Sequence, residues 1–347
     1  MVFPTVVIIG QVGNKFVLGS DSDVFTMTQP ITARRIVGDC TLTALSKPRY
    51  KLVKGAMMSF LKPESLQSYV SHLDEIVNAH IVSEIKEKES INAVDFMKKL
   101  TFDVTFTILF GIDRKSPKEA MFHDFDQIFK AWKQELLDGM INLRNDLLTW
   151  MLAIREENQE PITRVELIDS FIGIVIASHD TTSILLSLMM WKLARDPKII
   201  AKVHEEQMEI FLRKRRSGEK KLTWTDLQSM KYTWRVAQEL MRIIPLVFRN
   251  FREAAKDLYF GGYFIPKRWK VFWVSYGIQI NENIFENPKV FDPSRFENPS
   301  KPISPDMYVP FGGGPHMCSG NKFARVEILT IIHHMVTKFE WSQGDSR

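Results

Sequence analysis

Apolar residues recur at helical spacing along most of the chain. The clearest stripe lies between residues 66 and 81, where apolar positions are separated mainly by three or four residues, as on one face of a helix. Its members are Leu66, Tyr69, Val70, Leu73, Ile76, Val77 and Ile81. Similar patterns, with helix start and stop signals, predict helices over 51–61, 94–110, 121–137, 233–244 and 321–339. Segment 139–158 fits no single period.

Short runs rich in β-branched and aromatic residues mark a minor β component. Thr5–Ile9 and Phe16–Leu18 flank a turn signal at residues 13–15, so a hairpin is predicted near the N-terminus. More short strands are predicted around the turn at residues 261–262. Helices dominate, and the chain has neither an internal repeat nor a flexible linker. We therefore expect a mainly α (α+β) fold that forms one domain over residues 1–347.

Val165–Ala194 is the longest apolar segment, and it is apolar nearly all round. Such a helix lies in a protein core or spans a membrane. Membrane insertion would place Asp180 near the centre of the bilayer, at a cost of roughly 2.5–3.5 kcal/mol. Burial inside the protein is therefore the predicted outcome.

Composition narrows the class of protein. The chain is 45% hydrophobic, which is sufficient for a large core, and its net charge of +5 suits an acidic partner or an anionic membrane surface. The charge run Arg213–Lys221 has no interleaved aromatics, so a solvated loop is expected there rather than a nucleic-acid site. Cys40 and Cys318 are the only cysteines, which excludes a disulfide framework and favours a reducing compartment.

The segment FGGGPHMCSGNKFA, residues 311–324, carries the strongest chemical signal. Consecutive glycines let the backbone approach a flat ligand closely. Cys318 precedes a predicted helix, whose free N–H groups and dipole favour a thiolate, and a thiolate can be the axial ligand of haem iron. His316 is positioned to reach a haem propionate. The alternatives are a small buried cysteine and an ordinary loop.

Several positions in this segment fit the pattern Phe-x-x-Gly-x-Arg/His-x-Cys-x-Gly-x-x-x-Ala. They are Phe311, Gly314, His316, Cys318, Gly320 and Ala324. The segment resembles the haem-binding loop of the cytochrome P450 family, the haem-thiolate monooxygenases. The resemblance implies haem b with Cys318 as the axial iron ligand. It also implies that family's fold, a helical bundle with a long central helix and small β-sheets.

The central apolar segment contains a second motif, Ala177-Ser178-His179-Asp180-Thr181-Thr182. It resembles the family's oxygen-activation motif, Ala/Gly-Gly-x-Asp/Glu-Thr-Thr, with Ser178 at a position that is often glycine. That chemistry needs a hydroxyl and an acid that relays protons. The resemblance thus implies Asp180 and Thr181 as catalytic residues. The alternative is that these side chains only satisfy each other inside a core helix.

Glu239 and Arg242 are three residues apart on a predicted helix, a spacing that usually marks a surface ion pair. Arg295 lies between this pair and the cysteine. The order resembles the family's Glu–Arg–Arg network, which implies a structural role for all three residues.

The resemblance also suggests basic residues for the haem propionates besides His316. Lys54 lies about where related chains carry a basic residue, and a solvated surface position is its alternative. Arg252 follows the Glu239 helix at a suitable spacing, with Arg249 as the alternative.

Between Asn14 and Trp341 the resemblance is nearly continuous and points to plant terpenoid and triterpenoid oxidases. The implied enzyme is a monooxygenase that inserts one oxygen atom of O2 into a C–H bond of a hydrophobic terpenoid. Its electrons would come from NADPH through an NADPH-cytochrome reductase, which would dock on a basic face with Lys322 and Arg325. The implied location is the cytosolic face of the endoplasmic reticulum membrane.

The chain departs from this pattern in three places. Its first residues, MVFPTVVIIGQVG, contain no basic region before a long apolar run, so neither a signal peptide nor the family's membrane anchor is expected. Between Phe129 and Leu147 it is shorter than its relatives, which have pocket-roofing helices there, and it stops soon after Trp341. We therefore expect a domain incomplete at the N-terminus, around residues 130–147 and at the C-terminus, with low catalytic competence.

Parts of the sequence also suggest two other functions. The alternative is a truncated, non-catalytic relative that binds haem or an apolar ligand without productive turnover. A cysteine hydrolase that uses Cys318 with His333 or His334 is rejected. Those histidines lie roughly 22–24 Å along the same helix at a rise of about 1.5 Å per residue, too far for hydrogen bonding.

Overall fold

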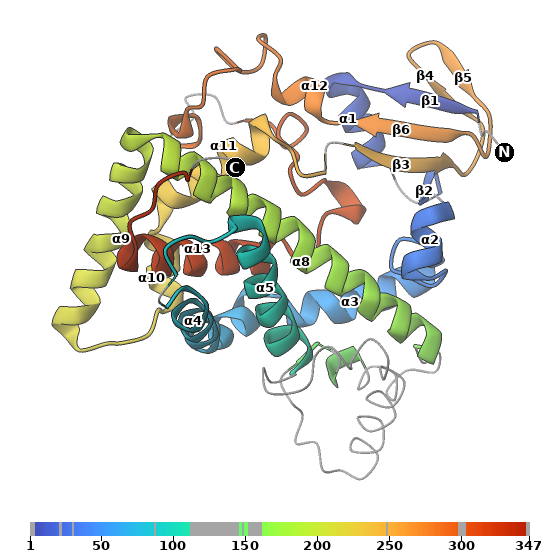
Figure 1. Cartoon of the computed structure of the whole chain (residues 1–347). Coiled ribbons are helices and arrows are strands. Elements are labelled where there is room, and N and C mark those ends of the chain that lie inside the picture. Colours follow the sequence, from blue (N-terminus) through green and yellow to red (C-terminus); the bar gives the residue numbers. More distant parts are fainter. Residues whose placement is uncertain are drawn as a thin grey trace.

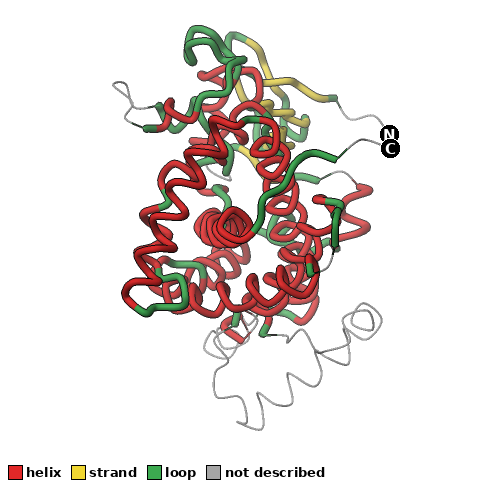
Figure 2. Tube along the Cα trace, turned by 60° about the vertical axis from the view of Figure 1, so that its left-hand side comes forward, coloured by secondary structure: helices red, strands yellow, loops and turns green. Residues whose placement is uncertain are grey.

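The computed structural model describes residues 4–20, 23–29, 31–86, 88–111, 146–147, 149–151, 162–247, 249–297 and 303–344. Its longer elements in chain order are β1 (Thr5–Ile8), α1 (Gly10–Gly19), β2 (Phe25–Met27), α2 (Ile31–Val37), α3 (Lys47–Phe60), α4 (Pro63–Ile85), α5 (Ala93–Val104), α8 (Arg164–Arg195), α9 (Pro197–Ser217), α10 (Trp224–Ser229), α11 (Lys231–Ile243), β3 (Arg249–Ala254), β4 (Leu258–Phe260), β5 (Tyr263–Ile265), β6 (Lys270–Val274), α12 (Tyr276–Gln279) and α13 (Asn321–Lys338). Helices form most of the molecule, and the strands gather at one end (Figure 1, Figure 2). The expected mainly α fold with small sheets is confirmed.

Helix α4 shows how the apolar stripe becomes packing. Pro63 occupies its first turn, where the missing N–H has no intrahelical partner to lose. The stripe faces the main core: Tyr69 and Ile76 are partly buried against it, and the other five members are at most 1% exposed. They are Leu66, Val70, Leu73, Val77 and Ile81.

The predicted helix over 94–110 is also present, in two parts. Asn92 caps α5 by accepting hydrogen bonds from the N–H groups of Val94 and Asp95. A π-helical turn, Thr105–Leu109, then continues the helix to Gly111, whose φ of 64° ends it in the left-handed region. The predicted helix over 121–137 lies outside the described residues, as does most of segment 139–158.

Helix α8 begins at a reciprocal cap. The Thr163 hydroxyl accepts from the Glu166 N–H, and the Glu166 carboxylate accepts from the Thr163 N–H. Arg49 of α3 donates from Nε to Glu166 Oε1 at 2.7 Å. This guanidinium bond, joined by those from Thr163, lowers the pKa of Glu166 to about 2 in spite of its burial. The start of α8 is thereby fixed to α3.

The rest of α8 crosses the helical bundle and packs against α5, α11 and α13 (Figure 1). By length and composition it could cross a membrane, and 33% of its most apolar window is buried. Leu185, Leu186 and Met189 are at most 2% exposed, whereas Ile176 and Ile184 are partly exposed. The helix therefore buries one face in protein and leaves a second apolar face accessible.

The larger sheet has the strand order β1–β6–β3–β2. Strand β1 runs parallel to β6, with Val7 opposite Phe272, and the other neighbours are antiparallel. Strands β4 and β5 form a separate hairpin around Gly261 and Gly262. Between the sheet and α1 lies a second small core that includes Val17, Phe25 and Trp273.

The predicted N-terminal hairpin is wrong. Only its first strand forms, and residues 10–19 make helix α1 instead. Gly13 lies inside this helix because it packs directly on Ile8, and a Cβ there would be 2.5 Å from Ile8 Cγ2. Asn14, Val17 and Leu18 are buried on the same helix. Tertiary packing thus overrode a local turn signal.

Candidate haem site

The cysteine loop reverses the chain just before α13. Its turns are held by backbone bonds from Gly312 N to Val309 O at 3.0 Å, and from Met317 N to Gly314 O at 3.1 Å. The Cys318 N–H donates to Phe311 O at 2.9 Å, so the first and eighth positions of the motif are joined. Ala324 N bonds to Gly320 O at 2.8 Å in the first turn of α13.

Gly314 is required by close contact as well as by conformation. Its φ is 61°, and a Cβ at this position would lie 1.9 Å from Leu18 O. Helix α1 therefore rests directly on the loop. One turn earlier on α1, Asn14 donates to Asp306 O at 2.7 Å and accepts from the Trp273 indole. These contacts tie the loop to the β-sheet.

The Cys318 thiol is subject to opposing influences. Part of the residue is exposed to solvent. Its thiol is nevertheless largely surrounded by protein atoms, which desolvate it. This desolvation raises the pKa of Cys318, whereas the Gly320 N–H and the Lys54 ammonium lower it. Desolvation is the larger effect, so the pKa lies above its usual value. The lowering expected from the helix start is present, through the Gly320 N–H, but desolvation outweighs it, so the net shift is opposite to the one expected.

Arg252 and His316 are the buried polar groups beside the cysteine loop. Arg252, on β3, is 3% exposed, and its guanidinium donates to Phe251 O at 3.1 Å. Within the described part of the chain no carboxylate lies at ion-pair distance from it. Both ring nitrogens of His316 are buried and lack a hydrogen-bond partner among the described residues. Burial, with the charges of Arg252 and Lys54, lowers the pKa of His316 to about 4.

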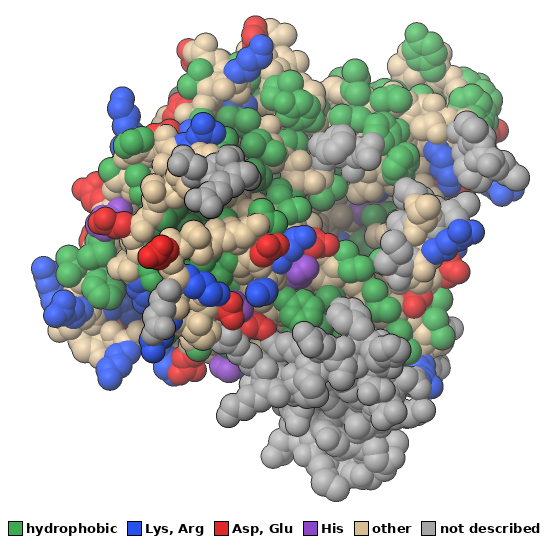
Figure 3. Space-filling view, in the orientation of Figure 1, with side chains coloured by type: hydrophobic (Ala, Val, Ile, Leu, Met, Phe, Trp, Pro, Cys, Tyr) green, Lys and Arg blue, Asp and Glu red, His purple; other side chains and the backbone are tan. Residues whose placement is uncertain are grey.

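A buried cation without a counter-ion is costly. The guanidinium of Arg252, which has no carboxylate partner in the described part of the chain, and the ring nitrogens of His316, which have no hydrogen-bond partner there, therefore suit a ligand that brings its own carboxylates to the cysteine loop. Haem does so through its two propionates, and the residues present fit this group. Figure 3 shows a hollow in the molecular surface between the β-sheet and α8.

Tyr50 and Lys54 of α3 reach the same loop from the opposite side. The Lys54 ammonium donates to Pro315 O at 2.5 Å, to Met317 O at 3.0 Å and to the Tyr50 hydroxyl at 2.9 Å. The Tyr50 ring lies against His316 with centroids 4.9 Å apart. Tyr50 was not among the site residues predicted from the sequence. The available signal was an aromatic residue four positions before Lys54 on a basic helix. The side chain of Arg249 lies outside the described residues.

The second motif lies mid-way along α8. The Thr181 hydroxyl donates to Ala177 O at 2.7 Å, and Ser178 donates to Ile174 O at 2.7 Å. In both bonds the hydroxyl donates to a carbonyl one helical turn earlier, so each hydroxyl oxygen can still accept a hydrogen bond. Asp180 is paired with its neighbour His179, Nδ1 to Oδ1 at 3.2 Å, and its side chain is 47% exposed. Each side chain is bonded elsewhere, and no hydrogen bond joins Asp180 to Thr181 in the described part of the chain, which argues against a mutually satisfied core pair.

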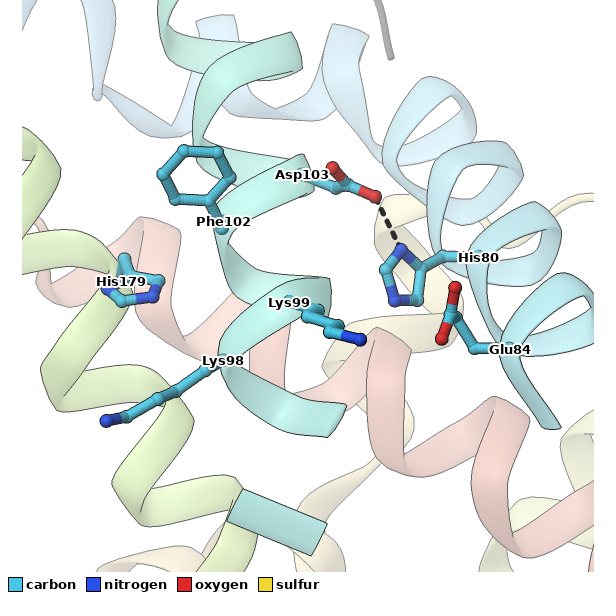
Figure 4. A pocket seen from close by; sticks show the side chains of 7 residues that line it. All are labelled: His80, Glu84, Lys98, Lys99, Phe102, Asp103 and His179. Carbon is cyan, nitrogen blue, oxygen red and sulfur yellow. Dashed lines mark hydrogen bonds and ion pairs between the residues drawn. The ribbon is translucent and has the colours of Figure 1, made fainter. Parts of the chain in front are cut away.

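His179 also lines a surface pocket of about 430 Å³ between α4, α5 and α8. Figure 4 shows its lining residues, with His80 and Asp103 joined across the gap between α4 and α5. His80 Nδ1 lies 2.5 Å from Asp103 Oδ2, and both residues are buried. The pocket combines residues from three helices, so no local pattern could have indicated it. His80 interrupts the apolar stripe of α4, which was the one available signal.

Glu239, Arg242 and Arg295 lie together. Arg242 binds Glu239 with two bonds, Nε to Oε2 at 2.7 Å and Nη2 to Oε1 at 2.8 Å, and both side chains are 0% exposed. Arg295 Nε reaches Glu239 Oε1 at 3.3 Å. Arg242 also donates to Gln279 O and Pro288 O, each at 2.7 Å. The three side chains thus connect α11 to the irregular segment that leads to the cysteine loop.

The histidines of the rejected hydrolase are engaged elsewhere. His334 Nε2 lies 2.6 Å from Asp74 Oδ1, and His333 Nδ1 lies 2.8 Å from Gln207 Oε1. Both contacts are buried ties between α13 and its neighbours α4 and α9.

Sequence comparison now decides the family. The cytochrome P450 family model matches residues 121–347, which is more than half of the chain. This chain belongs to the cytochrome P450 family. A taxoid 14-beta-hydroxylase of Taxus cuspidata is 30% identical over 97% of this P450 and 72% of its own length. A beta-amyrin 28-monooxygenase of Barbarea vulgaris is 32% identical over 98% and 77%, respectively.

A solved structure gives the same assignment. Retinoic acid bound cyanobacterial CYP120A1 superposes with a TM-score of 0.85 at 25% identity, covering 97% of this P450 and 83% of that chain. Membership implies haem with thiolate ligation, a redox partner and a hydrophobic substrate. At the level of its family, the protein is a P450 monooxygenase.

Proposed function

We propose that this P450 hydroxylates a hydrophobic terpenoid-like substrate, using O2 and electrons that an NADPH-cytochrome reductase delivers. The observation that carries the proposal is the cysteine loop with two buried groups beside it: Arg252, which has no carboxylate partner in the described part of the chain, and His316, whose ring nitrogens lack a hydrogen-bond partner there. The substrate class is drawn from the relatives, which are named for taxoid, taxane and beta-amyrin oxidation.

In this proposal the loop residues shape the haem site. Cys318 would ligate the iron, and Arg252 and His316 would bind the propionates, with the Lys54 charge nearby. Gly314 lets the loop pack against Leu18 of α1, Gly320 lies beside the Cys318 sulfur, and Phe311 and Ala324 pack the loop against the main core. Haem supplies the oxygen-activating chemistry when bound.

Asp180 and Thr181 are proposed to move protons. The Asp180 carboxylate is half exposed, so it is in contact with solvent. The Thr181 hydroxyl donates to Ala177 O while its oxygen remains able to accept. A proton taken up at Asp180 can then pass toward the Thr181 hydroxyl, which is the acid–alcohol arrangement that general acid catalysis requires.

The reductase is proposed to dock near the start of α13. Lys322 is exposed there, and Arg325 stacks over the Trp234 ring at 5.1 Å. Positive charge on this face would attract an acidic partner and raise the rate of encounter. We propose that the protein lies at the cytosolic face of the endoplasmic reticulum membrane, the location that its family resemblance implies.

A spectrum tests the proposal first. The purified chain, reduced and treated with carbon monoxide, should give the absorbance band of a thiolate-ligated haem, and Cys318→Ser should lose it at unchanged expression. With a plant reductase and NADPH, the chain should then convert a member of a panel of taxanes and triterpenes to a hydroxylated product. Absence of the thiolate band in the wild-type chain would refute the assignment of the site.

A further inference from the structure

Two hydroxyl groups of α8 lie one turn apart in the second motif. Ser178 donates to Ile174 O and Thr181 donates to Ala177 O, at 2.7 Å in both cases. Residues three apart on a helix are neighbours on its surface. The difference between the two side chains lies in what reaches the oxygen atom of each hydroxyl.

The Ser178 oxygen is engaged by α5. The Thr105 hydroxyl donates to Ser178 Oγ at 3.2 Å. Thr105 is 0% exposed, and Ser178 is the single partner of its hydroxyl among the described residues. In the same part of the chain no side chain donates to the Thr181 oxygen. A hydroxyl has two acceptor lone pairs, so Thr181 keeps both and Ser178 keeps one.

The packing of α5 on α8 sets the position of Thr105 (Figure 1). Thr105 begins the π-helical turn Thr105–Leu109, an irregularity that is frequent at functional sites. Two rings of this part of the helix pack on Phe171 of α8: Phe106, with centroids 6.1 Å apart, and Phe110, with centroids 4.2 Å apart. These rings fix the turn against α8 and thereby hold the Thr105 hydroxyl at its serine partner.

From these contacts we infer that Thr105 is a positioning residue for the second motif. It holds the Ser178 hydroxyl on the α5 side, and so leaves Thr181 as the hydroxyl of this turn whose oxygen no other helix engages. The inference rests on the proposed function, because it concerns the proton path assigned there to Asp180 and Thr181. It adds a residue from a different helix, which the motif itself does not contain.

Loss of the Thr105 hydroxyl would release a competitor for Thr181. Ser178 Oγ would regain a second open lone pair within one turn of Thr181, where it can hold water away from the proton path. Misplaced water at a reaction site favours side reactions. The side reaction here converts NADPH, a proton and O2 into NADP+ and hydrogen peroxide, without a hydroxylated product.

The ratio of product to hydrogen peroxide tests the inference, with the full haem-loaded chain, a plant reductase and the substrate found in the panel. Thr105→Val keeps the side-chain shape and should lower this ratio by roughly fivefold, the factor that corresponds to one hydrogen bond of about 1 kcal/mol. Adding Ser178→Ala should restore the ratio, because no hydroxyl is then left to misplace. An unchanged ratio in Thr105→Val, or a loss that Ser178→Ala does not restore, would overturn the inference.

Thr101→Val is the matched control. Thr101 is also a 0% exposed threonine of α5, and its hydroxyl reaches α8 at His179 O, at 3.3 Å, without contacting Ser178. This variant should keep the wild-type ratio even where it lowers stability, and so should Thr105→Ser, which retains the hydroxyl. An equal fall of the ratio in Thr101→Val would show that any weakening of the α5–α8 contact suffices, and would contradict a specific role for Thr105.

Thermal unfolding of the purified protein supplies a measurement that needs no turnover. Ser178→Ala leaves the Thr105 hydroxyl buried without a partner, whereas the double variant with Thr105→Val leaves neither side chain unmatched. The double variant should therefore lose less in melting temperature than the sum of the two single losses. Additive losses would contradict the bond, and Thr105→Ala takes the place of Thr105→Val if that variant does not fold.

The two levels of the proposal fail differently. If the wild-type chain forms no hydroxylated product, the proposed function is wrong, while the melting temperatures still decide whether Thr105 holds Ser178. If product forms and Thr105→Val has the wild-type ratio, the proposed function stands and the positioning role is wrong.

Discussion

Replacing Arg242 by methionine tests the buried ion network most directly. The substitution keeps much of the side-chain stem but removes every donor. It leaves the Glu239 carboxylate, which is 0% exposed, with only the Asp292 N–H at 2.9 Å and Arg295 Nε at 3.3 Å. It also removes the donor from the carbonyls of Gln279 and Pro288.

The expected loss is large relative to the total stability. Removing one partner of a buried ion pair costs about 3–5 kcal/mol, because the other charge is left uncompensated. A folded domain has only about 5–15 kcal/mol to lose. A second substitution at Glu239 would remove the unpaired charge but would not restore stability fully. The carbonyls of Gln279 and Pro288 would still lack the donor that Arg242 provides. We therefore expect Arg242→Met to lower the free energy of unfolding by at least about 3 kcal/mol.

Urea unfolding followed by circular dichroism measures this change. Arg235→Met is the matched control on the same helix, because Arg235 pairs with Glu297, whose side chain is 58% exposed, and should change stability by less than about 1 kcal/mol. Arg295→Met should fall between the two, since its side chain keeps 12% exposure and its bond is longer. A loss for Arg242→Met no greater than that for Arg235→Met would refute the reasoning.

Three further outcomes are expected. Thr181→Ala should keep its haem but divert reducing equivalents to hydrogen peroxide, and an unchanged ratio of product to NADPH consumed would count against a proton role. Gly314→Ala should lose haem and thermal stability, because its Cβ would lie 1.9 Å from Leu18 O, whereas Gly277→Ala, with open space around it, should behave as wild type. The folded-state pKa of Glu166 is about 2, below its ordinary 4.5, so its stabilisation is full above pH 4.5 and is lost as pH falls toward 2. Glu166→Gln should therefore flatten the acid limb of the stability profile, and an unaltered limb would contradict this.

Where a feature is local in sequence, the sequence predicted it well. The cysteine loop is contiguous, and its glycines signal the backbone angles that Gly312 and Gly314 adopt. Glu239 and Arg242 are one helical turn apart, so their pairing follows from spacing alone. Helix α4 follows from its stripe, because a single face of it meets the core.

Predictions failed where a residue's surroundings come from distant parts of the chain. The turn signal at residues 13–15 is genuine in isolation, but Gly13 is there to let α1 approach Ile8. The helix terminus does act on Cys318, through the Gly320 N–H, yet crowding by the rest of the fold raises the pKa of the thiol more than that contact lowers it. In each case a correct local effect was outweighed by a tertiary one.

The basic residues around the cysteine loop show most clearly what the sequence alone could not predict. From sequence, only His316 is favoured among the three basic residues, because it lies inside the cysteine motif, whereas Lys54 and Arg252 each have an alternative. The fold brings them together from α3, β3 and the loop itself, and only there do their bonds differ. Lys54 finds three acceptors within the protein, Arg252 donates to Phe251 O, and the ring nitrogens of His316 are buried without a partner among the described residues. These differences in bonding come from contacts between segments that are far apart in the sequence, so no spacing rule applied to the sequence alone could have predicted them.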